Sequence, residues 1–281
     1  MPEGNTVWLT ARALRTTLAG LALTHADLRV PDLATTDLVG QRVVDVVPRG
    51  KHLLIRLEPL SLTLHTHLRM DGRWRIHPAA YRVHDPDDHV RVVLANTNGT
   101  ALGWRVHDVA LVPTSAEDTL VGHLGPDLLG PDWDADEAIR RLRLAPSRAV
   151  GEALLDQRNL AGAGNVYKAE ICFLRGVSPW TPVGDVRDLA GLVDLAHRLL
   201  AANRERYDHV TTGDSRAGKR TWVYDRAGRP CRRCGTAIQV DSQGVDPHGK
   251  VTTKARLSYW CPRCQPGPVP APVAAAQRSR S

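Results

Sequence analysis

Two C-x-x-C pairs, Cys231/Cys234 and Cys261/Cys264, constrain the fold of the C-terminal part of the chain more than any other feature. Each pair can offer two thiolates from one turn, and two such turns form a tetrahedral sulfur site that suits zinc. The alternative is four unligated thiols in a reducing cell. Because the motif contains no histidine or carboxylate and implies no open position, we expect one structural Zn²⁺ ion. The fifth cysteine, Cys172, stands apart on a predicted helix and is expected in the core.

Composition and charge narrow the class of protein. The chain has 281 residues, of which 42% are hydrophobic and 24% charged, so we expect a globular protein of two domains. No apolar run is long enough for a membrane helix, and the start MPEGNTVW is not typical of a secretory signal. We therefore expect a cytoplasmic protein. A net charge of +7 favours a nucleic-acid partner, although it also fits an anionic membrane or no particular partner.

The first half of the sequence has the pattern of a helix followed by a β-sandwich. Apolar residues recur at helical spacing between Thr6 and Ala19. Eight short runs then alternate or are β-branched, and Gly, Pro and Asp separate them, as in an all-β sandwich. The expected strands are 26–30, 42–47, 52–57, 61–65, 73–76, 90–94, 101–104 and 109–112.

The second half has a helical period. Composition shifts near residues 113–131, which indicates a linker, and helices are predicted over 135–142, 150–155, 166–175 and 189–207. The tight turn Ala161–Asn165 places Asn165 at the N-cap of the third helix. The tail from Pro266, rich in Pro, Ala, Ser and Arg, is predicted to be disordered.

The N-terminus carries a candidate nucleophile. If Met1 is removed, Pro2 presents a secondary amine, part of which is neutral at cytosolic pH because an α-amino pKa is about 8. Attack of this amine on a sugar C1′ gives an iminium that cannot lose its charge by deprotonation at nitrogen. The iminium would then act as an electron sink for elimination.

Five short motifs precede the cysteine pairs, in the order Pro2-Glu3-Gly4, Arg49–Leu54, His67–Gly72, Leu160–Tyr167 and Val223–Arg226. With the pairs, they resemble the formamidopyrimidine-DNA glycosylase/endonuclease VIII family over nearly the whole chain except the tail. The resemblance implies a multi-domain α+β fold. Its parts would be an N-terminal catalytic β-sandwich with flanking helices (1–114), a linker (115–133), a helix–two-turn–helix DNA-binding domain (134–222), a zinc-finger β-hairpin (223–265) and the disordered tail (266–281).

The resemblance also implies roles for single residues. Pro2 matches the Schiff-base nucleophile, Glu3 the carboxylate that protonates the sugar ring oxygen and shuttles protons, and Lys51 a lysine that contacts phosphate and assists catalysis. Taken alone, Glu3 could be a solvated carboxylate and Lys51 a surface charge.

A second set of residues matches family positions that contact DNA. Asn165, at a helix start, and Arg256, in the finger, match phosphate ligands. His67 and Tyr224 occupy positions that often touch the DNA backbone. Met70 matches the side chain that fills the void left by a flipped base. The alternatives are a helix cap for Asn165 and core packing for Met70.

The sequence also departs from the family pattern. Asn5 and Thr6 replace a second Pro-Glu, and the cysteine pairs are further apart than usual, with the extra residues expected in a loop over Val240–Lys250. Ala95–Thr100 lacks the Asp-Pro-Arg-Arg-Phe-Gly motif of the oxidised-purine branch, and the loop Asp208–Lys219 is short for one that caps 8-oxoguanine. These departures favour the endonuclease VIII branch, which prefers oxidised pyrimidines.

The function implied is that of a bifunctional DNA glycosylase and abasic-site lyase of base excision repair. It would excise an oxidised base through a Schiff base on Pro2 and cleave the strand by β,δ-elimination. The expected partner is double-stranded DNA with oxidised bases or abasic sites, bound by a monomer in a basic cleft between two domains, with no membrane association. The alternatives are a non-catalytic zinc-finger DNA-binding protein on the same scaffold, and an enzyme that prefers oxidised purines.

Overall fold

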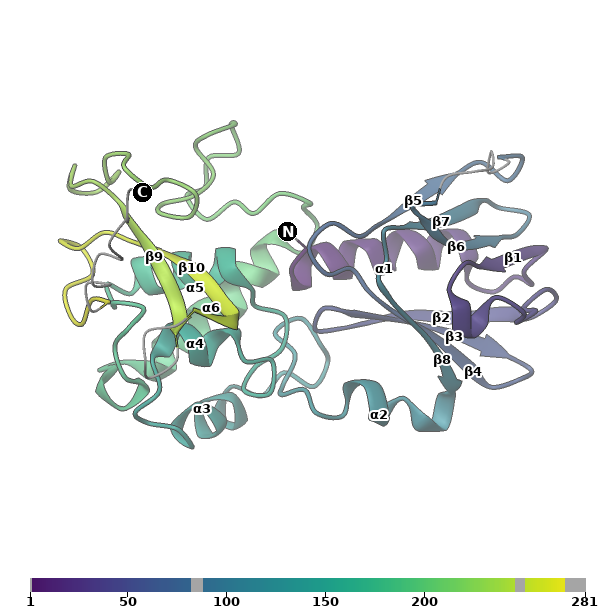
Figure 1. Cartoon of the computed structure of the whole chain (residues 1–281), viewed down its shortest axis with the longest axis horizontal. Helices are drawn as coiled ribbons and strands as arrows, with labels where there is room; N and C mark the ends of the chain where they lie inside the picture. The colour runs from purple at the N-terminus through teal and green to yellow at the C-terminus, as the bar shows by residue number, and fades with distance from the viewer. Residues whose placement is uncertain (1, 82–87, 246–250, 271–281) are drawn as a thin grey trace, which may run out of the picture. The chain divides into compact units, whose positions relative to one another are not determined.

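The computed structural model describes residues 2–81, 88–245 and 251–270, and the chain divides into two compact units (Figure 1). Unit 1 comprises Met1–Trp133 and Ala201–Asp208, and unit 2 comprises Asp134–Leu200 and His209–Ser281. Within the described residues, no helix combines the length and apolarity that a membrane crossing requires.

Unit 1 contains helix α1 (Gly4–Leu18) and two four-stranded antiparallel sheets. One sheet has the order β2-β3-β4-β8 and the other the order β1-β6-β7-β5. The predicted β-sandwich is confirmed, with all eight strands within a few residues of their expected positions. Their bounds are β1 His25–Leu28, β2 Arg42–Arg49, β3 His52–Glu58, β4 Leu62–His67, β5 Arg73–His77, β6 Val90–Ala95, β7 Thr100–Trp104 and β8 Asp108–Pro113.

The core of unit 1 lies along α1. Val7, Ala11, Leu14 and Leu18 follow one another at intervals of three or four residues, so they share one helix face, and all four are fully buried. This face packs against strands of both sheets, including β2 and β5, with buried residues such as Val46. Burial of each large apolar side chain stabilises the unit by about 1.5–3 kcal/mol. The helix is therefore fixed along its length, which matters for the residues that precede it.

The segment 115–133, predicted as a linker, is packed on unit 1. It begins within the short helix η2 (Thr114–Ala116) and contains α2 (Asp118–Val121). Glu117 accepts hydrogen bonds from Arg56 on β3 at 2.8 and 2.7 Å and from the Thr63 hydroxyl on β4 at 2.6 Å. A further short helix, η1 (Pro31–Leu33), follows β1.

Unit 2 is helical and ends in a β-hairpin. Its helices are α3 (Ala135–Arg143), α4 (Val150–Leu155), α5 (Asn165–Leu174), η3 (Val183–Asp185) and α6 (Leu189–Asn203), which continues into unit 1. The antiparallel hairpin is formed by β9 (Gln239–Val245) and β10 (Val251–Trp260). Nearly every residue of α5 is buried, which makes it the central helix of the unit.

Three sequence predictions are wrong in detail. Gly164, rather than Asn165, is the N-cap of α5. Helix α6 ends at Asn203 instead of Tyr207, because the Asn5 side chain binds the backbone oxygens of Asn203 and Arg206 and the chain turns there. The predicted loop Val240–Lys250 is a β-strand as far as Val245, since it pairs with β10.

Two predicted regions extend beyond the described residues. Residues 246–250 of the expected loop lie outside them, as do residues 271–281 of the tail predicted to be disordered. The first residues of that tail are described, and the Pro268 oxygen accepts a hydrogen bond of 2.5 Å from the Ser178 hydroxyl.

Candidate active site and metal centre

Pro2 and Glu3 occupy the start of α1 in unit 1. Pro2 is half-buried, and Glu3 is the fully buried N-cap residue of the helix. A capping box joins Glu3 and Thr6, in which the Glu3 backbone N–H donates to the Thr6 hydroxyl at 3.5 Å. Glu3 is therefore not a solvated surface carboxylate. Because α1 is held by its buried face, the position of Pro2 is fixed by the fold.

The departure from the family pattern at Asn5 and Thr6 has a structural counterpart. Thr6 supplies the hydroxyl of the capping box. Asn5 is fully buried, and its amide nitrogen donates to the backbone oxygens of Asn203 at 3.4 Å and Arg206 at 3.0 Å. These two residues thus fix the helix start and join it to the segment that follows α6.

Lys51 lies in the tight turn between β2 and β3. Gly50, with φ +57°, adopts the left-handed conformation this turn requires, and its N–H donates to Asp127 Oδ2 at 2.6 Å. Asp127 is 3% exposed and also accepts from the Leu129 N–H at 3.0 Å. Burial raises the pKa of Asp127, while these hydrogen bonds oppose the shift. Sequence reasoning missed Asp127, which holds the Lys51 turn from a segment far along the chain.

His67, at the end of β4, belongs to a cluster with His52, His65 and His123. The rings of His52 and His67 meet edge to face at 4.7 Å, and His52 Nδ1 lies 2.8 Å from His65 Nε2. Burial, followed by neighbouring histidines, lowers the pKa of His52 to about 3. Burial also lowers the pKa of His67 to about 4, with Asp108 opposing and Arg69 and Lys51 adding to the shift.

His67 is consequently neutral at pH 7, and its surroundings fix its tautomer. Nδ1 accepts the backbone N–H of Arg69 at 3.0 Å, so the ring proton must reside on Nε2. A neutral imidazole in this tautomer offers one N–H donor, which suits a phosphate oxygen. His67 pairs with His52 across the β3–β4 ladder, and Lys51 directly precedes His52, so the fold brings these two predicted DNA contacts close together.

Met70 lies on the loop between β4 and β5 and is 60% exposed, so it is not a core residue. Its two neighbours are anchored. Arg69 donates two hydrogen bonds to Asp108, at 2.5 and 3.0 Å, and Asp71 contacts His107 at 3.1 Å. The flexible apolar side chain of Met70 is therefore exposed on a loop that is held on both sides of it.

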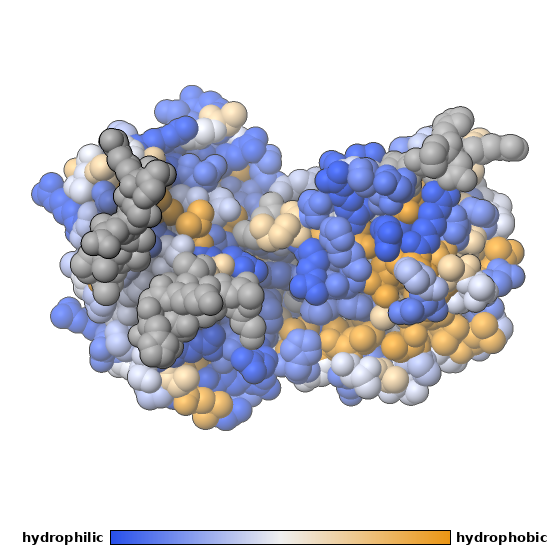
Figure 2. All heavy atoms as spheres, in the orientation of Figure 1, coloured by the Kyte–Doolittle hydropathy of each residue, from blue (hydrophilic) through white to orange (hydrophobic). Residues whose placement is uncertain are grey.

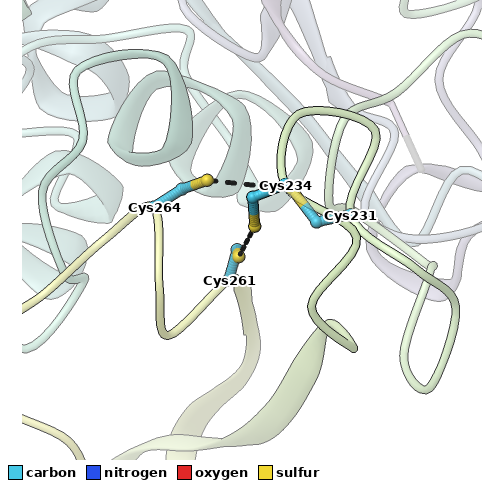
Figure 3. Close-up of side chains that lie close together, drawn as sticks. All are labelled: Cys231, Cys234, Cys261 and Cys264. Carbon is cyan, nitrogen blue, oxygen red and sulfur yellow. Dashed lines mark hydrogen bonds between the residues drawn. The ribbon is translucent and has the colours of Figure 1, made fainter.

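The four predicted metal ligands converge in unit 2 (Figure 3). The Sγ atoms of Cys231 and Cys264 are 3.9 Å apart, those of Cys234 and Cys261 are 3.4 Å apart, and all four lie within 4.8 Å of one another. Zinc–sulfur bonds of about 2.3 Å in a tetrahedron place sulfurs about 3.8 Å apart, so the residues fit one zinc ion. Cys172 is not part of this group. It is fully buried, and burial raises its pKa to about 12.

Asn165 and Arg256 are brought close by the packing of α5 on the hairpin. Asn165 is 7% exposed and its amide nitrogen donates to the Leu257 oxygen at 2.9 Å. The buried Lys168, one turn later, donates to the same oxygen at 3.1 Å and to the Ser258 hydroxyl at 2.6 Å. Arg256, adjacent to Leu257, is exposed. The Asn165 amide nitrogen carries two hydrogens, so a second N–H can be donated to a phosphate oxygen while the first remains on Leu257.

Tyr224 is positioned by Glu170, which sequence reasoning missed. The Glu170 carboxylate is fully buried and accepts the backbone N–H groups of Trp222, Val223 and Tyr224 at 2.7, 2.9 and 2.9 Å, together with the Thr211 hydroxyl. Burial raises the pKa of Glu170, and these hydrogen bonds oppose the shift. The only signal in the sequence is an acidic residue within the otherwise apolar stretch Ala169–Leu174.

The same segment contacts the cysteine site. Trp222 stacks on Phe173 of α5 with ring centroids 5.5 Å apart. Arg233, between the first two cysteines, lies over both rings, at 4.7 Å from Phe173 and 5.8 Å from Trp222. Cys231 and Cys261 are themselves part of the buried cluster that contains Phe173. The metal site and the Tyr224 segment therefore share one small core.

Comparison with known proteins supports the sequence interpretation. Residues 1–109 match the model of the formamidopyrimidine-DNA glycosylase N-terminal domain. A probable endonuclease 8 2 of Streptomyces coelicolor is 52% identical, over 97% of this chain and 96% of the relative. The DNA-(apurinic or apyrimidinic site) lyase Nei2 of Mycolicibacterium smegmatis is 45% identical, over 94% of this chain and 99% of the relative.

The fold is similar to that of solved DNA complexes. A complex of Lactococcus lactis Fpg with DNA that contains an abasic site superposes with a TM-score of 0.76 at 22% identity, covering 95% of this chain and 100% of that chain. A complex of the same protein with DNA that carries an N7-benzyl-Fapy-dG lesion gives a TM-score of 0.75, also at 22% identity and with the same coverage. These similarities confirm the α+β fold class.

Proposed function

Because the chain belongs to the formamidopyrimidine-DNA glycosylase/endonuclease VIII family, we propose that it is a bifunctional DNA glycosylase and abasic-site lyase of base excision repair, with Pro2 as its nucleophile. Relatives of 52% and 32% identity carry the names probable endonuclease 8 2 and endonuclease 8, which favours the endonuclease VIII branch. The substrate is then double-stranded DNA with an oxidised pyrimidine or an abasic site.

The observation that carries this proposal is the burial of Glu3 as the cap of α1, directly after Pro2. A nucleophile must be held in place to gain from proximity. The core-packed helix holds Pro2, and the capping box fixes the backbone between the amine and the helix. A carboxylate is therefore adjacent in the chain to a secondary amine whose position does not depend on a mobile terminus.

The reaction follows from the chemistry of that amine. Its lone pair attacks C1′, the glycosidic bond breaks and the base leaves, while Glu3 supplies a proton to the opening sugar ring. The product is an iminium between Pro2 and C1′. Loss of a C2′ proton expels the 3′ phosphate by β-elimination, and a further proton loss expels the 5′ phosphate by δ-elimination. Hydrolysis of the iminium then frees the amine.

DNA is held by residues of both units. In unit 1, the Lys51 ammonium group is a cationic phosphate donor, and the Nε2–H of His67 is a neutral one. Unit 2 contributes further contacts to the DNA backbone from Asn165, Tyr224 and Arg256. The exposed Met70 fills the space that the flipped nucleotide leaves. The protein acts as a monomer and needs no membrane.

The four cysteines would hold one structural zinc ion. Their sulfur-only donor set would leave no position for a substrate ligand, so the ion would supply folding energy to the hairpin and take no part in bond cleavage.

Borohydride trapping on an oligonucleotide with an abasic site tests the nucleophile. We expect a covalent adduct with the mature protein, whose mass spectrum should show that Met1 is absent. A tag fused before Pro2 should abolish the adduct, and the same tag fused after Ser281 should leave it unchanged. An untagged protein that binds the oligonucleotide without trapping would indicate a non-catalytic DNA-binding protein.

A second set of assays separates the two steps and the lesion class. Glu3→Gln retains an acceptor for the helix cap, so it should keep the fold and trap an abasic site while losing base excision. Duplexes with thymine glycol, 5-hydroxyuracil or 8-oxoguanine should rank the pyrimidine lesions first. Preferential cleavage of the 8-oxoguanine duplex would instead assign the enzyme to oxidised purines.

A further inference from the structure

Three arginines surround one tryptophan on the β5–β7 face of unit 1. The guanidinium carbons of Arg73, Arg75 and Arg105 lie over the Trp104 ring, at 4.1, 4.9 and 4.4 Å from its centroid. All three distances are within the range of a cation–π interaction. We name these four residues the Arg–Trp patch. Figure 2 shows hydrophilic residues gathered over the part of unit 1 where Figure 1 draws β5 and β7.

The sheet explains how the patch forms. Arg73 pairs with Trp104, and Arg75 pairs with Leu102, across the β5–β7 ladder. Side chains two residues apart share a face, so both arginines stand on the same side as Trp104. Beneath them, Val90 and Leu102 belong to a small buried cluster against which Trp104 packs. Trp104 is thereby fixed, and it orders the arginines that lie over it.

The charges of the patch are poorly neutralised. Arg105 contacts Asp71 at 3.4 Å. Across the part of the chain that the structure describes, neither Arg73 nor Arg75 forms an ion pair with a carboxylate, and both are exposed. Like charges held together repel each other, and an anion between them would remove that cost. Guanidinium groups that lie over a ring keep their in-plane N–H donors available for such an anion.

A second tryptophan in the same unit shows a contrasting arrangement. Arg12 and Arg204 lie over Trp8, at 6.0 and 5.2 Å from its ring centroid. Arg12 is paired with Glu205 at 3.3 Å. The Trp8 group thus offers a matched control, with the same kind of contact but with a carboxylate partner and fewer arginines.

We propose that the Arg–Trp patch binds the phosphate backbone of DNA beside the lesion, and that Arg73 and Arg75 each neutralise one phosphate. The patch begins three residues after Met70, and Asp71 joins the Met70 loop to Arg105. A strand that receives the Met70 side chain therefore passes next to the patch. Arg73 and Arg75 are two residues apart on β5, about 6.8 Å between their Cα positions, so their guanidinium groups can reach different phosphates of one DNA strand. This inference rests on the proposed function, which places Met70 against DNA.

The salt dependence of DNA binding tests the proposal. Binding of a duplex with a non-cleavable abasic-site analogue is measured for the wild type and for the Arg73→Ala/Arg75→Ala variant between 50 and about 300 mM salt. Each phosphate contact contributes about −0.9 to the slope of log K against log salt, so loss of two contacts should reduce the slope by about 1.8. The Arg12→Ala/Arg204→Ala variant should keep the wild-type slope. A wild-type slope in the Arg73/Arg75 variant would overturn the proposal.

A second variant tests the role of the indole. Trp104→Leu keeps all three charges and the apolar packing but removes the ring that orders the arginines. We expect weaker binding with a nearly unchanged slope, because the phosphates are still neutralised by less ordered side chains. Unchanged affinity would show that Trp104 does not organise the patch.

Borohydride trapping at saturating protein separates this inference from the proposed function. The patch variants should need more protein than the wild type to trap abasic DNA, because they bind it more weakly, but should still form the adduct at saturation, because Pro2 is intact. Failure of the wild type to trap would refute the proposed chemistry, whereas the slope reports on the patch alone. Unfolding midpoints in urea, equal for the exposed Arg73→Ala/Arg75→Ala variant and the wild type, would confirm that the fold is intact.

Discussion

Substitution of Glu170 by Gln should loosen the segment that carries Tyr224 without unfolding unit 2. In the wild type, one carboxylate oxygen accepts the N–H groups of Val223 and Tyr224, and the other accepts the Trp222 N–H and the Thr211 hydroxyl. The Gln oxygen can keep the first pair. The amide nitrogen, in place of the second oxygen, can donate to Thr211, whose hydroxyl can turn to the Arg220 oxygen at 3.2 Å.

The Trp222 N–H is then the one donor left without an acceptor. A buried donor that loses its partner costs about 1–3 kcal/mol. Since each 1.4 kcal/mol corresponds to a factor of ten, local opening of the segment should increase by about 5- to 150-fold. The cost falls on residues 211–224, so global stability should change less than local protection.

Hydrogen exchange followed by mass spectrometry measures this effect directly. Peptides that contain Trp222 should exchange faster in Glu170→Gln by the factor given above. Glu152→Gln, on α4 of the same unit and half-exposed, is the control and should leave exchange unchanged. If the Trp222 amide is equally protected in Glu170→Gln, the carboxylate does not hold this segment and the reasoning is wrong.

Three further predictions concern pH, metal and thiol chemistry. The pKa values of His52 and His67 fall to about 3 and about 4 in the folded state. The unfolded chain therefore binds more protons below pH 6.5, and the free energy of unfolding should decrease by about 2 kcal/mol per histidine from pH 7 to pH 5 in urea titrations, less in His67→Gln. Removal of metal from the four-cysteine site should abolish the near-ultraviolet circular dichroism of Trp222 and Phe173, because the cysteines share their core; an unchanged spectrum in metal-free protein would contradict this. The buried Cys172 thiol, with a pKa of about 12, should resist thiol reagents until the protein is denatured, as mass mapping of the labelled cysteines can show.

The features that the sequence predicted are those that short-range patterns encode. The strands of unit 1 follow from alternation over a few residues, and α1 follows from the spacing of Val7, Ala11, Leu14 and Leu18. The convergence of the four cysteines was predictable because two C-x-x-C turns in one chain are typical of a metal site. The boundary of α6 was wrong because Asn5, almost two hundred residues away in sequence, determines where the helix ends.

The contacts that sequence reasoning missed all join distant segments. Asp127 binds Gly50 across 77 residues, and Glu170 binds Trp222 across 52 residues. No local pattern marks either carboxylate, since an acidic residue in a loop or in a buried helix has many possible partners. The arrangement of Arg73 and Arg75 on Trp104 depends likewise on the register between β5 and β7, which a single strand does not reveal.

The three buried carboxylates share one physical role. Glu3 accepts the N–H of Thr6 in the first turn of α1, next to Pro2, whereas Asp127 and Glu170 accept N–H groups of turns next to Lys51 and Tyr224. Such N–H groups have no acceptor in a neighbouring strand or an earlier helix turn, and the oxygens of one buried acidic side chain can satisfy more than one of them. A fold that places its proposed DNA-contacting residues on turns needs such anchors, because turns have little apolar area of their own to bury. The turns that carry Lys51 and Tyr224 are therefore held by buried acidic side chains in addition to core packing, and substitutions at these anchors should affect DNA processing before they affect folding.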